Sequence, residues 1–219
     1  MQIEIADIIT ADDLGRARAV LGAATFTEGK STAGWAVRDV KNNAQARPDA
    51  AIAELKAVLA KRIEENPVFS LAVRPKRLIS LMFAKYSAGQ SYGTHVDNAI
   101  MEGERSDVSF TLFLSSPESY DGGELILEHP GGEDAIKLQA GSLFAYPATM
   151  LHRVAPVTRG ERLVLVGWVR SLIRDGSRRE LLFDLDTARR RLFAQLGKTA
   201  DIDILAKCTA NLLRMWVED

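Results

Sequence analysis

Apolar and polar positions recur with different periods along the chain, and the first part has the period of helices. Over residues 49–65 apolar side chains return every three or four residues, which predicts a helix with one stripe facing a core. Another helix is predicted from a cap at Thr10 to about Leu21, after a short strand at residues 1–9. Residues 23–47 have no clear period and are expected to be irregular.

From residue 77 to residue 170 the pattern changes to short apolar runs separated by turn residues. Short strands at this spacing are typical of a sandwich or barrel rather than of alternating strands and helices. Gly122-Gly123 and Gly131-Gly132 are expected to form hairpin turns. The predicted strands span residues 77–86, 93–97, 107–115, 123–128, 134–138, 142–146, 152–157 and 162–170.

The last part of the chain returns to the helical period. The stretch from Ser177 to Glu180 has the form of a capping box, and an apolar stripe follows it up to Gly197. A further helix is predicted from about Asp201 to Val217. The apolar stripe that precedes Gly197 consists of Leu181, Leu182, Leu185, Leu192 and Leu196.

Composition is that of an ordinary globular protein, with 219 residues of which 47% are hydrophobic and 26% charged. We expect a supporting region at residues 1–76, a strand-rich core at 77–171 and a helical appendage at 172–219. The net charge of −1 gives no reason to expect binding to nucleic acid, and the apolar runs are too short for a membrane helix. A single cysteine, Cys208, and a start unlike a signal peptide favour the cytoplasm.

The candidate chemistry begins at His95-Val96-Asp97, inside a predicted strand. Side chains two positions apart on a strand share a face, so this imidazole and carboxylate would lie close together. Such a triplet alone is more often a surface histidine beside a solvated aspartate. The only other histidines are His129, in a predicted turn, and His152, which enters a predicted strand. His152 is the better candidate for completing a two-histidine, one-carboxylate site of the kind found in non-haem Fe(II) oxygenases.

Arg162 follows His152 by ten residues and begins the last predicted strand. By alternation its side chain shares a face with the apolar side chains at every second position up to Trp168, as on an interior face. Burying an arginine unpaired costs several kcal/mol, so it needs an anionic partner. Glu161 or Glu124 could serve, and a dicarboxylate ligand would provide a bidentate pair. The plainer alternative is a surface arginine at the start of a strand.

Tyrosines flank the same region, and with them the motifs resemble a known family. Tyr86 and Tyr92 could hydrogen-bond a bound carboxylate, although buried tyrosines more often only fill a core. The pattern is similar to the iron- and 2-oxoglutarate-dependent dioxygenases of the prolyl 4-hydroxylase type. It consists of Tyr86-x-x-Gly89-x-x-Tyr92-x-x-His95-x-Asp97-Asn98, Asp121-Gly122-Gly123-Glu124-Leu125, Gly141-Ser142-Leu143-Phe144 and the pair His152 and Arg162. Residues 95–100 and 146–154 resemble the bacterial PKHD-type hydroxylases, which are often associated with iron uptake.

The resemblance implies a jelly-roll core, mainly β with flanking helices (α+β). It implies that His95, Asp97 and His152 are the catalytic metal ligands and bind Fe(II). Arg162 and Tyr86 would bind the distal carboxylate of 2-oxoglutarate. The further implications are O2 as co-substrate, L-ascorbate as reductant, and hydroxylation of an unidentified small molecule or protein side chain.

Other functions remain open at this point. A non-enzymatic jelly-roll or cupin-like module could bind a metal or small ligand, but simple metal binding needs no buried arginine. An interaction protein could use the helical appendage as its active surface, and the same helices could form a homo-oligomer contact. A zinc hydrolase is disfavoured because no general base stands beside the candidate ligands. Residues 23–47, with Trp35 and Val37 as candidates for a strand, are the expected substrate lid.

Overall fold

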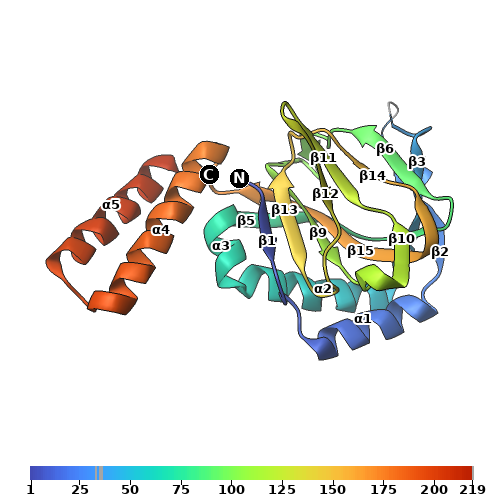
Figure 1. The fold of residues 1–219 in the computed structure, drawn as a ribbon, viewed down its shortest axis with the longest axis horizontal. Helices are drawn as coiled ribbons and strands as arrows, with labels where there is room; N and C mark the ends of the chain where they lie inside the picture. Colours follow the sequence, from blue (N-terminus) through green and yellow to red (C-terminus); the bar gives the residue numbers. More distant parts are fainter. Residues whose placement is uncertain (33, 35–36, 219) are drawn as a thin grey trace.

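The computed structural model describes residues 1–32, 34 and 37–218 (Figure 1). The helices are α1 (Ala11–Ala23), α2 (Ala50–Glu65), α3 (Pro67–Val73), α4 (Gly176–Leu196) and α5 (Ala200–Trp216), and short 3-10 helices span Gly29–Thr32 and Pro117–Ser119. The strands are β1 (Ile3–Ile5), β2 (Phe26–Glu28), β3 (Lys41–Asn42), β4 (Ala44–Ala46), β5 (Pro75–Ser87), β6 (Ser91–His95), β7 (Ile100–Met101), β8 (Glu104–Arg105), β9 (Val108–Phe113), β10 (Tyr120–Gly122), β11 (Leu125–His129), β12 (Gly132–Ile136), β13 (Leu143–Pro147), β14 (His152–Val154) and β15 (Val157–Ser171).

Two antiparallel sheets form the body of the molecule. The larger sheet has the order β1-β13-β9-β15-β5-β4-β2, with β10 also paired to β15, and the smaller has the order β12-β11-β14-β6-β3. Helices α1, α2 and α3 cover the outer face of the larger sheet, and their apolar side chains share one core with it (Figure 1). The inner faces of the two sheets line a common cavity. This arrangement confirms the expected jelly-roll core with flanking helices.

The helices that cover the sheet follow their sequence signals closely. Of the predicted stripe of α2, Ile52, Leu55, Leu59 and Ile63 are at most 1% exposed, and Val58 is half-buried. Asn66, where the sequence indicated only the end of α2, also begins α3. Its side chain accepts hydrogen bonds from the amides of two residues in the first turn, and proline at the first helical position suits a helix start. The prediction missed α3 because Asn-Pro was interpreted only as a stop signal.

Residues 23–47 are more regular than the sequence indicated, because they contain β2, β3 and β4. These strands are short and have no period of their own. They form because their backbones pair with longer strands, as where Ala44 lies opposite Lys85 of β5. Val37 lies in a turn, and the prediction for Trp35 falls outside the described residues.

The predicted hairpin at Gly122-Gly123 is wrong. These glycines, with φ of 71° and 69°, join β10, which pairs with β15, to β11 of the other sheet. A Cβ on Gly122 would lie 2.0 Å from the carbonyl oxygen of Pro156, so only glycine fits this crossing. Gly131-Gly132, in contrast, does lie at the turn of the hairpin between β11 and β12.

Helices α4 and α5 form an antiparallel pair that projects from the sheets (Figure 1). Helix α4 begins at Gly176 with Asp175 as its cap, two residues before the predicted capping box begins. Of its predicted apolar stripe, Leu182 is fully buried, whereas Leu181, Leu192 and Leu196 are 48%, 38% and 64% exposed. Among the residues described, no helix combines the length and apolar character needed to cross a membrane.

Candidate active site

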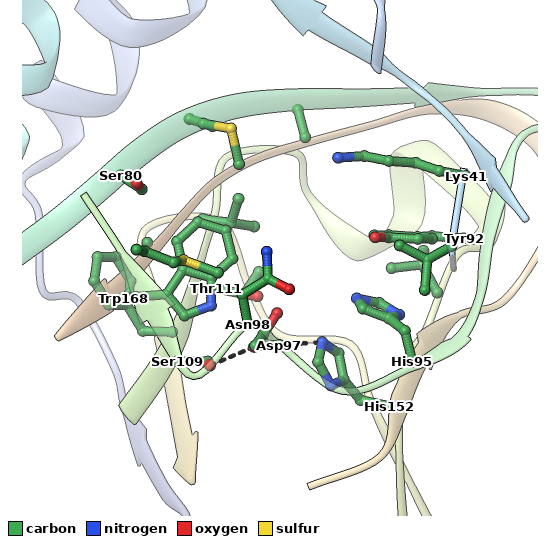
Figure 2. Close-up of a pocket in the computed structure, with 18 of the residues that line it drawn as sticks. Lys41, Ser80, Tyr92, His95, Asp97, Asn98, Ser109, Thr111, His152 and Trp168 are labelled. Carbon is green, nitrogen blue, oxygen red and sulfur yellow. Dashed lines mark hydrogen bonds and ion pairs between the residues drawn. The ribbon is translucent and has the colours of Figure 1, made fainter. Parts of the chain in front are cut away.

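Three of the predicted site residues meet on one wall of the cavity between the sheets (Figure 2). Ligand atoms of His95, Asp97 and His152 all lie within 4.8 Å of one another. His95 ends β6 and lies opposite His152, the first residue of β14, so the two imidazoles share a face with ring centroids 4.2 Å apart. Asp97 lies beyond the end of β6, so the prediction that both residues of the motif lie within one strand is wrong. The segment after the strand still brings its carboxylate to within 3.8 Å of His152 Nε2.

Hydrogen bonds from the chain fix the orientation of these three side chains. His95 Nδ1 lies 2.9 Å from the carbonyl oxygen of Gly93, and His152 Nδ1 lies 3.0 Å from that of Met150. A carbonyl can only accept, so each Nδ1 carries the proton and each Nε2 keeps its lone pair for a metal. Ser109 Oγ donates to Asp97 Oδ2 at 2.6 Å and holds the carboxylate in place.

The environment keeps His95 uncharged. Burial, together with the neighbouring His152, lowers the pKa of His95 to about 4, so the ring is neutral near pH 7 and able to coordinate. The Tyr92 ring stacks on His95 at a centroid distance of 3.8 Å. Lys41 Nζ lies 5.2 Å from the Tyr92 centroid, and burial lowers the pKa of Lys41 to about 8 although Asp97 acts in the opposite direction.

Arg162 is a buried cation in the same cavity and is only 1% exposed. Its guanidinium carbon lies 5.2 Å from the centroid of the Tyr86 ring and 5.5 Å from that of Phe113. The carboxylates considered from the sequence do not pair with it: Glu161 lies 3.5 Å from Lys85, and within the described chain no ion pair joins Arg162 to an acid. Its Nε also lacks a hydrogen-bond partner there. A buried, uncompensated cation of this kind fits an anionic ligand.

Two tyrosines stand beside that cation. Tyr86 lies opposite Arg162 in the sheet register and is 4% exposed. Burial raises the pKa of Tyr86, which Arg162 and a hydrogen bond with Asn43 offset in part, so its hydroxyl is a protonated donor. The buried hydroxyl of Tyr120 lacks a well-formed hydrogen bond within the described residues. A buried hydroxyl without a well-formed partner, beside a buried guanidinium, is what a carboxylate-binding site requires before its ligand arrives.

The cavity has a volume of about 380 Å³ and continues past the three candidate ligands in both directions. Arg162 and Trp168 line it from the same strand, β15, as the alternation predicted. They are six residues apart, which corresponds to about 20 Å along a strand. The cavity therefore has one end with a buried cation and another end at Trp168.

Sequence comparison identifies the family. Residues 81–170 match the family model of the 2OG-Fe(II) oxygenase superfamily, and residues 175–218 match that of the PKHD-type hydroxylase C-terminal domain. The PKHD-type hydroxylase AM1_3707 of Acaryochloris marina is 52% identical over 219 residues, with all of both chains covered. The chain belongs to the PKHD-type hydroxylases. A relative from Maricaulis maris, again a PKHD-type hydroxylase, is 44% identical over the full length of both chains.

Solved structures agree with this assignment of the PKHD-type hydroxylase. A prolyl-4-hydroxylase of Pseudomonas putida superposes with a TM-score of 0.55 at 25% identity, over 78% of this chain and 92% of that one. A 2OG-Fe(II) oxygenase family protein of Burkholderia pseudomallei has a TM-score of 0.59 at 15% identity, over 76% and 82% of the two chains, and supports the fold alone. The chain is therefore an oxidoreductase, a hydroxylase of a family that uses Fe(II), 2-oxoglutarate and O2.

Sequence reasoning missed several residues of this site. Ser109, Lys41 and Asn43 all line the cavity, but none belongs to a motif that the sequence analysis used. Ser109 could have been found from the alternation along β9, which places it on the inner face together with Thr111. Lys41 and Asn43 lie in the stretch that had been expected to be irregular, where no period was available to orient them.

Proposed function

We propose that this PKHD-type hydroxylase binds Fe(II) through His95, Asp97 and His152 and couples oxidative decarboxylation of 2-oxoglutarate to hydroxylation of a substrate. The observation that carries the proposal is the position of Arg162, a buried cation without an acidic partner in the described chain, in the same cavity as the three candidate ligands. A metal-binding module alone would have no use for it. When bound, Fe(II) and 2-oxoglutarate supply the activation of O2 that hydroxylation requires.

The chain's own part is to bind, orient and exclude water. The carbonyls of Gly93 and Met150 would keep both Nε2 atoms directed at the metal, and Ser109 would keep Asp97 in place. Arg162 would hold the distal carboxylate of 2-oxoglutarate through charge-assisted hydrogen bonds, with Tyr86 donating a further one. The apolar walls around them would keep water away from the reacting atoms.

The remaining assignments are proposals supported by the position of each segment. Residues 77–171 would be the catalytic core, 1–76 its support and 172–219 a helical appendage. Residues 23–47 would form the substrate lid, which is supported by Lys41 and Asn43 lining the cavity from this region. L-Ascorbate as reductant, a cytoplasmic location and a link with iron uptake rest on the family resemblance. The substrate would be a small molecule or a protein side chain.

The appendage is also proposed to form a homo-oligomer contact. Its helices expose large apolar side chains that the rest of the described chain does not cover. Two copies of a helix pair can bury such faces against each other as a four-helix bundle. These side chains are Leu181, Leu192, Phe193, Leu196, Ile204 and Met215.

Succinate formation from 2-oxoglutarate in the presence of Fe(II) tests the proposed function. We expect His95→Ala to abolish it, because a metal ligand is removed, and Arg162→Ala to reduce it strongly at 2-oxoglutarate concentrations that do not saturate the variant, because the partner of the co-substrate is removed. His129→Ala is the matched control, since His129 is the histidine that lies outside the site, 3.5 Å from Asp134. Parental turnover in both site variants would refute the proposal, and metal binding without any turnover in the parent would favour a simple binding module.

A further inference from the structure

The Trp168 end of the cavity is shaped by a β-bulge. The register between β5 and β15 shifts beside Trp168, so that one residue of β15, Gly167, stands opposite Ser80 and Leu81 of β5. A Cβ on Gly167 would lie 2.4 Å from the Leu81 side chain and 2.6 Å from the Phe110 ring, so packing beside the bulge favours glycine there. Ser80 has φ of 51°, which is uncommon for a residue with a side chain, and it lines the cavity. Such backbone strain is concentrated at functional sites.

A small apolar cluster lies at this end of the cavity. Trp168 is one of its members, and Val166 packs both against it and against the core between the two sheets. The indole Nε1 of Trp168 is buried, the residue being 9% exposed, and this donor has no hydrogen-bond partner among the described residues. Native proteins rarely leave a buried donor unpaired, so an acceptor from outside the chain is implied. The cluster contains Ile79, Ala148 and Trp168, with Met82, Met101 and Val166 packed against them.

A 2-oxoglutarate molecule bound at Arg162 cannot supply the hydrogen-bond acceptor for Trp168 Nε1. Trp168 lies opposite Ser109, the residue that holds Asp97, whereas Arg162 is about 20 Å further along the strand. A five-carbon diacid spans only about 6 Å. Figure 2 shows Trp168 on the side of Asp97 away from Lys41 and Tyr92. The ligand of the Trp168 end is therefore a second molecule, beside the candidate metal ligands.

Charge at this end narrows the chemistry of the ligand. Glu102, in the turn between β7 and β8, lines the cavity and accepts a hydrogen bond from Ser80 Oγ at 2.9 Å. Its carboxylate is exposed, so solvent screens it in part, but it would still repel a second carboxylate placed against Trp168. In the proposed loaded site, Asp97 and the two carboxylates of 2-oxoglutarate would balance the charges of Fe(II) and Arg162, so the metal centre would leave little net positive charge to offset that repulsion. Lys41 lies on the far side of Asp97 (Figure 2). A neutral acceptor is favoured.

We propose that the Trp168 end is the substrate subsite of this hydroxylase and takes a neutral carbonyl, of the amide type, carried on a compact apolar body. The carbonyl accepts from Trp168 Nε1, and the apolar body packs against Met82 and Met101. This inference rests on the proposed function, because the opposite end is assigned there to 2-oxoglutarate. It makes Trp168 a residue that determines specificity.

NMR of the full chain, labelled with ¹⁵N in tryptophan and ¹³C in the methionine methyl groups, tests the subsite. The chain has three tryptophans, so Trp168→Phe assigns the indole signal. The protein is loaded with Zn(II), a diamagnetic substitute for Fe(II), and with 2-oxoglutarate. The probes are isovaleramide, isovalerate and isoamylamine, which share an apolar body and offer a neutral carbonyl, a carboxylate and no acceptor. Met82 and Met101 report binding when the indole has been removed.

We expect a saturable downfield shift of the Trp168 indole proton with isovaleramide, at least fivefold weaker binding of isovalerate, and no such shift with isoamylamine. Trp168→Phe keeps an aromatic ring and should weaken isovaleramide binding about five- to tenfold. Trp216→Phe, in α5, is the matched control and should change nothing. Glu102→Gln should reduce the preference for amide over carboxylate.

An indole shift with the amine equal to that with the amide, or unchanged amide binding in Trp168→Phe, would overturn the inference. The result is separable from the proposed function. Decarboxylation of 2-oxoglutarate by a protein whose Trp168 signal never moves would refute the subsite alone. A specific indole shift in a protein that never consumes 2-oxoglutarate would refute the proposed reaction and leave the subsite in place.

Discussion

The two-sheet core and the C-terminal helix pair differ in how far their apolar side chains are exposed to solvent. In the core, Leu112 and Leu127 are completely buried. In the helix pair, Leu196, Ile204 and Met215 are 64%, 58% and 72% exposed. A core closed to water suits a reaction that depends on excluding it, whereas a pair of helices with open apolar faces suits contact with another surface.

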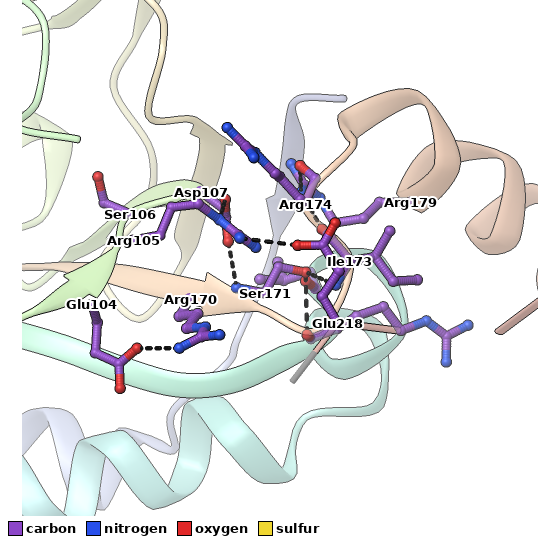
Figure 3. Close-up of polar contacts among 12 residues, drawn as sticks. Glu104, Arg105, Ser106, Asp107, Arg170, Ser171, Ile173, Arg174, Arg179 and Glu218 are labelled. Carbon is purple, nitrogen blue, oxygen red and sulfur yellow. Dashed lines mark hydrogen bonds and ion pairs between the residues drawn. The ribbon is translucent and has the colours of Figure 1, made fainter. Parts of the chain in front are cut away.

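The two regions are joined by a polar junction (Figure 3). Glu218, just after α5, donates its amide to the carbonyl of Leu172 at 2.8 Å, and its carboxylate lies 3.0 Å from Arg105 Nη1. Arg105 Nε lies 2.7 Å from Asp107, which in turn accepts from the amide of Ser171. Arg105 belongs to β8, which pairs with β7, and both residues of β7 line the cavity. The end of the helix pair is therefore attached to that wall of the cavity.

The largest effect is expected inside the core, at the candidate metal ligands. Asp97→Ala should lower succinate formation by at least about 100-fold and weaken Fe(II) binding, because a ligand and its negative charge are both removed. Asp134→Ala, which removes a half-exposed carboxylate, is the control. Calorimetric titration with Fe(II) under anaerobic conditions measures the binding, and an unchanged affinity in Asp97→Ala would contradict the assignment.

Arg162→Met should affect activity and stability in opposite directions. Loss of the guanidinium should raise the KM for 2-oxoglutarate about 10- to 100-fold, since charge-assisted hydrogen bonds disappear. Removing a buried cation that has no acidic partner in the described chain should raise the free energy of unfolding by about 1 kcal/mol. Steady-state kinetics and urea unfolding without co-substrate measure the two. Arg159→Met removes an exposed arginine that pairs with Asp121, and should change neither by much.

Ser109→Ala tests whether support of a ligand matters as much as the ligand itself. The hydroxyl fixes one oxygen of Asp97, so its loss should weaken Fe(II) binding about tenfold, less than the loss of the carboxylate. Ser106→Ala is a comparable control, because its hydroxyl bonds the carbonyl of Asn98 rather than Asp97. Equal Fe(II) affinities in both variants and the parent would mean that the backbone after β6 positions Asp97 without Ser109.

Truncating a buried side chain of the core should lower the free energy of unfolding far more than truncating an exposed side chain of the helix pair. Leu112→Ala should lower the free energy of unfolding by about 2–5 kcal/mol, because it leaves a cavity in a closed core. Met215→Ala, on the exposed face of α5, should change it by less than about 0.5 kcal/mol in a monomer. Sedimentation equilibrium of the parent shows whether the protein is a monomer or a homo-oligomer. If the helix pair forms a homo-oligomer, Ile204→Glu should dissociate it without reducing turnover in the core.

Sequence reasoning reached the core of the site because alternation is a local property of a strand. Arg162 and Trp168 were placed on one interior face by counting residues, and the structure has both in the cavity. Scarcity of histidine selected His152, which the structure brings next to His95. Alternation along β9 could have placed Ser109 on the inner face, but not its hydrogen bond to Asp97, because that contact depends on how segments far apart in the sequence come together.

The helix pair shows what the sequence pattern could not predict. Its apolar stripe was recognised correctly as a helical period, but period alone does not say whether the stripe has a partner within the chain. Leu182 has one and Leu196 does not. The strands within residues 23–47 were not predicted for a related reason: their pairing partners, rather than their own side chains, decide their conformation.

The smallest expected effect lies at the junction between the two regions. Glu218→Gln keeps the backbone hydrogen bond to Leu172 but removes the charge beside Arg105, so the ribbon of β7 and β8 should open more often. Because the Glu218 side chain is 46% exposed, solvent screens the pair, and amide exchange in residues 99–106 should rise only about two- to threefold. Asp203→Asn, which removes an exposed carboxylate of α5 near Lys198, should leave that exchange unchanged. Hydrogen exchange followed by mass spectrometry measures it.

Equal exchange in the parent and in Glu218→Gln would mean that Asp107, which is tied to Ser171, holds the cavity wall without help from the helix pair.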